Sequence, residues 1–251
     1  HIPAISPWHR AVSGDLTSAF DFATPDAALP TLPSAKGASA MLLEHIQRPK
    51  ARPPATPDPI FQEPGVRPSR ALPYELHVDA AQDAKGVTLK FRNTGSAGAV
   101  FHVYDRNNLA AIPRRYTVEA GKSLSGVWAA GEGYDLWVLG PNGFLRTFKG
   151  AKPGIEAALT YDRTGAAVTL AVSNRTAGAL SLTLRSNAYG QNAPKTIAIA
   201  AGGKARESWG VKDSGMWYDL SIADEGFERS FAGRLETGAH GVSDPALGTP
   251  T

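Results

Sequence analysis

The sequence has no cysteine among its 251 residues, so disulfide bonds and thiolate metal sites are excluded. No apolar run approaches the ~18 residues that a membrane-spanning helix needs. No run of five like charges occurs, and the net charge is only +3, so the charge gives no argument for a nucleic-acid partner. No signal peptide is visible, and the chain starts with His1 rather than Met, which is typical of a processed or truncated chain.

Short catalytic motifs are also missing. The histidines are scattered and form no His-Glu-x-x-His spacing, and no Gly-x-Ser-x-Gly elbow occurs. Gly121-Lys122-Ser123 and Gly202-Gly203-Lys204 lack the earlier glycine of a phosphate loop, and hairpin turns explain both. Asn174 starts a glycosylation sequon, but a turn role suits it better because Asn93 holds the same repeat position without one. The predicted metal and cofactor content of this chain is therefore none.

What the chain does contain is a long internal repeat. The stretch Tyr134–Gly150 recurs as Tyr218–Gly233, and Trp128 recurs as Trp209. The period is much longer than that of a solenoid, so each copy should bury its own core. A domain of ~80 residues is only modestly stable, and docking between the copies is expected. The repeat positions that we single out are Trp128, Tyr134, Asp135, Phe144, Trp209, Tyr218, Asp219 and Phe227.

Short alternating segments within each copy predict an all-β fold of two tandem Ig-like antiparallel sandwiches with about seven strands each. Val87, Leu89 and Phe91, for example, should face inward. The first copy should have strands near 74–78, 87–93, 100–104, 115–118, 123–128, 133–139 and 144–149. The second should have them near 155–161, 167–173, 180–185, 195–199, 204–209, 217–223 and 227–232.

The preceding segment is irregular. A short helix could carry Leu16, Ala19 and Phe20, and Met41, Leu42 and Ile46 predict a second helix over 38–47. Eight prolines between Arg48 and Pro73 favour an extended linker. The predicted organisation is 1–33, 34–73 with a short helix and the linker, 74–150 and 154–235 for the two sandwiches, and 236–251 for a C-terminal tail.

The repeated residues allow two interpretations. Trp128 and Trp209 are expected in the two cores. Asp135 and Asp219 are expected to accept hydrogen bonds from the backbone or from Arg146 and Arg229, a structural role rather than a catalytic one. His102 and Tyr104 share one strand face without a counterpart in the second copy. The alternative is an aromatic surface for sugars or lipids, built from Tyr134, Trp137, Trp217 and Tyr218.

Long motifs give the chain a family resemblance. The stretch Ser6–Phe22, with Ser-Pro-Trp-x-Arg-Ala-Val-x-Gly-Asp-Leu-Thr, resembles the end of the phosphoesterase domain in bacterial phosphocholine-specific phospholipase C. The tandem C-terminal domains of those enzymes are similar to Arg67–Tyr74, Val100–Asp105, Arg114–Val118, Tyr134–Phe144, Gly233–Gly238 and Ser243–Pro245.

The resemblance implies an exported enzyme that releases phosphocholine from phosphatidylcholine, and often from sphingomyelin, by means of a metal-dependent phosphoesterase domain. No metal-ligand or nucleophile motif of that domain falls within this chain, so no catalytic residue is carried over. Residues 1–33 would be a remnant of the catalytic domain, and the chain alone should be inactive. The expected role is a non-catalytic C-terminal region, secreted or periplasmic, with the catalytic domain and a phospholipid surface as partners. An independent lipid- or glycan-binding module is the alternative.

Overall fold

The computed structural model of the chain describes residues 65–83, 86–151, 153–190 and 193–247 continuously. It also describes residues 6, 20–24, 28–32, 34–50, 52–53 and 55–56. The chain divides into two compact units, one formed by 1–13 with 63–251 and the other by 14–62. The short helix predicted around Leu16 lies outside the described residues.

The smaller unit contains the helix that the sequence predicts. Helix α2 spans Ala38–Gln47 and starts after Gly37, whose φ of 85° is left-handed and is easily adopted only by glycine. It stops ahead of Pro49, as expected from the missing amide hydrogen. None of its side chains is buried, and its apolar residues Met41 and Ile46 are exposed. No helix in the described part of the chain is long and apolar enough to cross a membrane.

The larger unit is built from antiparallel strands, seven in each repeat as described. The first repeat holds β2 Leu76–Asp83, β3 Gly86–Asn93, β4 Ala99–Asp105, β5 Arg114–Val118, β6 Ser123–Trp128, β7 Tyr134–Leu139 and β8 Leu145–Gly150. The second holds β9 Ile155–Asp162, β10 Ala167–Asn174, β11 Leu180–Ser186, β12 Lys195–Ile199, β13 Lys204–Gly210, β14 Trp217–Asp224 and β15 Phe227–Arg234. The predicted all-β class is confirmed, and most strand ends lie within two residues of the prediction.

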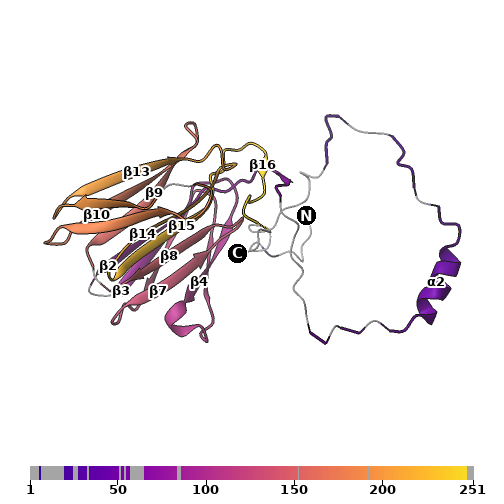
Figure 1. Cartoon of the computed structure of the whole chain (residues 1–251), viewed down its shortest axis with the longest axis horizontal. Helices are drawn as coiled ribbons and strands as arrows, with labels where there is room; N and C mark the ends of the chain where they lie inside the picture. Colours follow the sequence, from indigo (N-terminus) through magenta and orange to yellow (C-terminus); the bar gives the residue numbers. More distant parts are fainter. Residues whose placement is uncertain are drawn as a thin grey trace. The chain divides into compact units, whose positions relative to one another are not determined.

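Each repeat is a sandwich of a three-stranded and a four-stranded layer. In the first repeat β2, β3 and β6 form one layer, and in the second β9, β10 and β13 do. The other layers are not separate, because β8 pairs with β15 in antiparallel fashion and joins them into one eight-stranded sheet. Its order is β12-β11-β14-β15-β8-β7-β4-β5, and Figure 1 shows β15, β8, β7 and β4 side by side.

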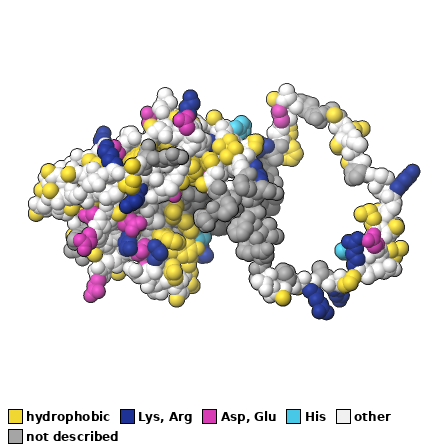
Figure 2. All heavy atoms as spheres, in the orientation of Figure 1, with side chains coloured by type: hydrophobic (Ala, Val, Ile, Leu, Met, Phe, Trp, Pro, Cys, Tyr) yellow, Lys and Arg dark blue, Asp and Glu magenta, His cyan; other side chains and the backbone are white. Residues whose placement is uncertain are grey.

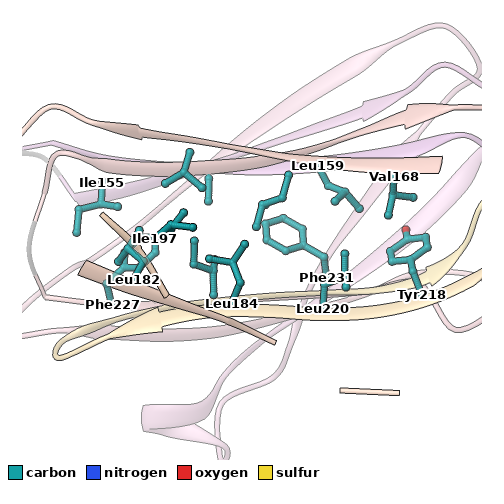
Figure 3. Close-up of a cluster of buried hydrophobic side chains, with 14 of the residues drawn as sticks. Ile155, Leu159, Val168, Leu182, Leu184, Ile197, Tyr218, Leu220, Phe227 and Phe231 are labelled. Carbon is teal, nitrogen blue, oxygen red and sulfur yellow. The ribbon is translucent and has the colours of Figure 1, made fainter. Parts of the chain in front are cut away.

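Each repeat encloses its own apolar core. Val87, Leu89 and Phe91 on β3 are fully buried, as their alternation predicts. In the second core, side chains from the two layers interdigitate, among them Leu159 and Phe231 (Figure 3). Trp128 is buried in the first core, but Trp209 is only half-buried and packs against the margin of the second. The expectation of two equivalent core tryptophans is therefore wrong for Trp209, although Trp128 and Trp209 both lie on edge strands, β6 and β13.

The end of the proline-rich segment pairs with the C-terminal tail. Strand β1, Pro68–Ser69, forms a short antiparallel pair with β16, Gly241–Val242. The indole of Trp217 donates to the carbonyl of Val242 at 3.1 Å, so the tail is attached to the second repeat as well.

Candidate functional site

Two buried arginines lie where the repeats meet. Along the β8–β15 pair, Arg146 lies opposite Phe231 and Arg229 lies opposite Phe148. The two arginines hold matching repeat positions, so an approximate two-fold axis passes between them. Each is almost completely buried, at 1% and 2% exposure. Both side chains lie on the inner face of the joined sheet and reach toward residues of the other repeat.

Arg146 of the first repeat contacts the core of the second. It donates to the carbonyls of Leu145 at 2.7 Å and Ala232 at 2.8 Å, and to the hydroxyls of Tyr161 at 2.6 Å and Tyr218 at 2.9 Å. Its guanidinium also lies over the ring of Phe144 at 4.1 Å. Carbonyls, hydroxyls and aromatic faces thus replace the water lost on burial of this cation.

Arg229 of the second repeat makes the reciprocal contacts. It donates to the carbonyls of Lys149 at 2.7 Å and Glu228 at 2.8 Å, and to the hydroxyl of Tyr134 at 2.5 Å. Its guanidinium lies over Phe227 at 4.3 Å. Burial lowers the pKa of Arg229, and the contact with Tyr134 opposes this. An arginine side chain stays protonated in proteins, so a cation from each repeat lies within the other.

These contacts explain the repeat signature. Phe144 and Phe227 each stack on the arginine of their own repeat. Tyr218 and Tyr134 each accept a hydrogen bond from the arginine of the other repeat. Gly150 and Gly233 lie opposite Tyr134 and Tyr218 across the strands. A Cβ atom at either glycine would lie 3.1 to 3.2 Å from the facing tyrosine hydroxyl. The repeated motif is therefore the junction between the two sandwiches.

The predicted partners of the two repeated aspartates are wrong. Asp135 accepts from Arg106 at 3.5 Å, and Asp219 accepts from the amide of Asn187 at 2.8 Å. Neither contacts Arg146 or Arg229, because side chains alternate along a strand and the aspartates face outward while the arginines face inward. The part of the expectation that these acids have hydrogen-bonding partners is confirmed.

One cavity of about 340 Å³ opens at one end of the junction, lined by Tyr134 and Phe227 from the two repeats. Its charged lining residues are Asp135, Asp224, Glu228 and Lys149. Among the described residues that line it there is no serine, cysteine or histidine, and the hydroxyl of Tyr134 already accepts from Arg229. The described lining residues of the cavity therefore bring charges together without a Ser-His or Cys-His pair.

The matching place at the other end of the junction is filled. There Phe144, Arg234, Leu235 and Glu236 leave only about 30 Å³. Leu235 is 2% exposed, and Arg234 pairs with Glu236 at 2.5 Å. Residues after the last strand of the second repeat thus close this end.

The other predicted site residues are not brought together. In the described part of the chain, no three His, Asp or Glu side chains form a group that could hold a metal ion. Asn174 is fully buried and donates to the carbonyls of Gly178, Ile199 and Ala200, so its amide is not available for glycosylation. Asn93 has the same role, which sequence reasoning described only as a turn.

The aromatic surface suggested by the sequence is reduced to one tryptophan. Tyr134, Tyr218 and Trp217 are buried, whereas Trp137 is 37% exposed on the outer face of β7. His102 and Tyr104 lie beside it on β4, facing Leu139 and Trp137 in the strand register. Sequence alternation places these residues on one face, but it does not show which face is covered.

Comparison with known proteins agrees with this architecture. Residues 68–151 and 155–234 each match the family described as bacterial phospholipase C, C-terminal domain. The chain is 41% identical over 99% of its length to a non-hemolytic phospholipase C of Pseudomonas aeruginosa, and 42% identical over 98% to one of Burkholderia pseudomallei. A hemolytic phospholipase C of Pseudomonas aeruginosa is 33% identical over 97% of the chain.

The chain spans 38%, 37% and 39% of the lengths of these three relatives. Both matched segments end at the close of a sandwich, and together they cover the junction with its two arginines. The chain therefore belongs to the family of bacterial phospholipase C C-terminal domains.

Proposed function

We propose that this chain is the non-catalytic C-terminal region of a phospholipase C and that it supports a catalytic domain elsewhere in the same polypeptide. The observation that carries the proposal is the double family match over residues 68–151 and 155–234. The relatives bear the name phospholipase C and are more than twice as long as the part matched. Their additional length leaves room for a separate catalytic domain.

The structure supports a bracing role through the junction. The eight-stranded sheet and the exchanged arginines make the two sandwiches one body. The described lining residues of the junction cavity include no serine, cysteine or histidine. A body of this kind can present a large fixed surface to a neighbouring domain.

The reaction that we propose for the whole enzyme is hydrolysis of phosphatidylcholine, and also of sphingomyelin, to phosphocholine and diacylglycerol or ceramide. We assign the catalysis and a metal requirement to the catalytic domain and a secreted or periplasmic location to the enzyme. These assignments rest on the resemblance of the long motifs and on the names of the relatives.

The experiment is a domain replacement in the Pseudomonas aeruginosa non-hemolytic relative. Its matched C-terminal region is either removed or replaced by this chain, and phosphocholine release from phosphatidylcholine vesicles is measured together with thermal stability. The replacement should release phosphocholine and melt at a higher temperature than the truncated protein. This chain alone should release no more than its heat-inactivated control.

Two results would contradict the proposal. Phosphocholine release by the purified chain would make it catalytic. Equal activity and equal melting temperature of the truncated and replaced proteins would show that the region supports nothing in the enzyme.

A further inference from the structure

The loop between β4 and β5 of the first repeat exposes large apolar side chains. The 3-10 turn η2 spans Arg106–Asn108, and Leu109 follows it with 68% exposure. Ile112, just before β5, is 84% exposed. We call these two side chains the apolar tip. Leaving both in water costs free energy unless another phase covers them.

On each side of the loop an arginine is stacked on a tryptophan. On the β4 side, Arg106 lies 4.3 Å from the ring centroid of Trp137. On the β5 side, Arg114 lies 3.9 Å from that of Trp128 and donates to the carbonyl of Val127 at 2.8 Å. The stacking fixes both guanidinium groups next to the apolar tip.

Positive charge exceeds negative charge around the tip. The carboxylate of Asp105 accepts from the backbone of Asn107 at 3.0 Å, and that of Asp135 accepts from Arg106 at 3.5 Å. Arg114 and Arg115 form no ion pair within the described residues, and both are exposed. The local charge is therefore complementary to phosphate groups.

The outer sheet face continues the apolar surface. Trp137 is 37% and Leu139 is 39% exposed on β7. Figure 2 shows hydrophobic spheres gathered over the lower part of this sandwich, with Lys and Arg spheres beside them. Monomeric proteins rarely leave such a surface without a partner.

The second repeat has the same strand order without this chemistry. Ser221 and Ala223 hold the positions of Trp137 and Leu139. In the matching loop, Tyr189 donates to Asp244 at 2.5 Å, and at the start of β12 Lys195 pairs with Glu207 at 2.6 Å. Because the fold does not require an exposed apolar tip, the tip serves another purpose.

We propose that the loop with Leu109 and Ile112 docks the protein on a phospholipid surface, with Arg106, Arg114 and Arg115 meeting lipid phosphates and Trp137 at the interface. A membrane boundary favours this arrangement of aliphatic side chains at a tip, arginines beside them and a neighbouring tryptophan. A flat protein partner would not require aliphatic side chains at a protruding turn. The inference goes beyond the proposed function, because the chain should bind lipid without any catalytic domain.

The test is co-sedimentation of the chain with vesicles of phosphatidylcholine alone and of phosphatidylcholine mixed with phosphatidylglycerol. The double substitution Leu109→Ser with Ile112→Ser should lower the partition constant by about tenfold per side chain on both vesicle types. The matched control is Val66→Ser with Leu247→Ser, which changes two other exposed apolar residues and should leave binding unchanged.

The contribution of the arginines beside the apolar tip is tested with a second matched pair of variants. Arg115→Glu should weaken binding to the anionic vesicles by about fivefold or more, and high salt should reduce the difference. Arg185→Glu makes the same charge change at an exposed position on β11 of the second repeat and should have little effect.

A fluorescent label reports which loop enters the lipid. Because the chain has no cysteine, Ile112→Cys gives a single labelling site. An environment-sensitive dye there should shift to shorter emission wavelength on vesicles, whereas the same dye at Gly190→Cys in the matching loop of the second repeat should not.

Three results would overturn the proposal. The chain could fail to bind either vesicle, or the tip variant could bind as well as the parent chain with an unshifted label at position 112. A concentration-dependent dimer in the absence of lipid that the tip variant abolishes would instead assign this surface to self-association. None of these readouts depends on phospholipase activity, so this proposal and the proposed function can fail separately.

Discussion

The guanidinium of Arg146 donates to the hydroxyl of Tyr218 over 2.9 Å, and the two residues belong to different repeats. Arg229 and Tyr134 form the same contact in the opposite direction. Each sandwich is thus completed by a cation from its neighbour. The junction is part of both cores and not only a contact between two finished domains.

Removal of the Arg146 side chain should destabilise the whole larger unit. Arg146→Ala removes the side chain that donates to two carbonyls and two tyrosine hydroxyls and opens a cavity, and we expect a loss of about 4 kcal/mol in the free energy of unfolding. Urea unfolding followed by tryptophan fluorescence measures this. Arg185→Ala, at an exposed position, is the control and should cost less than ~0.5 kcal/mol.

The tyrosines provide a finer test of the same contacts. Tyr218→Phe removes one hydroxyl that accepts from Arg146, and Tyr134→Phe removes the one that accepts from Arg229. Each should cost about 2 kcal/mol, since a hydrogen bond to a charged group is lost. A cost near zero for both would show that the arginines are stabilised by the carbonyls and ring faces alone.

The two repeats should unfold together. Splitting them would expose the paired edges of β8 and β15 and leave each buried arginine without its partners. We expect one calorimetric transition for the larger unit, with calorimetric and van't Hoff enthalpies equal. Two separate transitions, or a well-folded isolated 154–247, would contradict this.

Much of the fold could be predicted from the sequence because it depends on local patterns. Alternation located the strands, and Pro49 located the end of the helix. The expectation that Asp135 accepts hydrogen bonds from the backbone or from Arg146 failed, although both residues were identified. A repeat shows that residues matter in both copies, but it does not show whether they act within a copy or across the copies.

The remaining features could not be predicted because they depend on strands far apart in sequence. Pairing of β8 with β15 is set by the fit of the two outer edges, which no short pattern records. Exposure of Leu109 and Ile112 depends on what covers their loop, and an apolar residue in a turn is equally consistent with burial. Comparison of the two repeats offered a signal, since Trp137 corresponds to Ser221.

The two repeated tryptophans should differ in their contribution to stability. Trp128→Ala removes a buried side chain from the first core and should cost about 4 kcal/mol. Trp209→Ala affects a half-buried side chain at the margin of the second core and should cost about 2 kcal/mol. Urea unfolding of both variants, with the second repeat still folded in Trp209→Ala, checks this. Equal costs would place Trp209 in the core after all.

His77 should make stability depend on pH. Burial, together with Arg92, lowers the pKa of His77 from 6.5 to about 4, while Glu75 acts in the opposite direction. The unfolded chain therefore binds a proton below pH 6.5 that the folded chain does not accept until about pH 4. The contribution of neutral His77 to the free energy of unfolding is complete above pH 6.5 and is lost as the pH falls from 6.5 to about 4. The loss should reach about 2 kcal/mol by pH 5.

The variant His77→Gln separates this effect from the neighbouring acids. Burial raises the pKa of Asp79, so its titration stabilises the folded chain on acidification, in the opposite sense to His77. As the pH falls toward 5, the parent chain should lose unfolding free energy relative to His77→Gln, because the variant has no imidazole to protonate. Identical pH profiles would show that His77 accepts a proton in the folded chain as readily as in the unfolded one, for example through its contact with Glu75 at 3.5 Å.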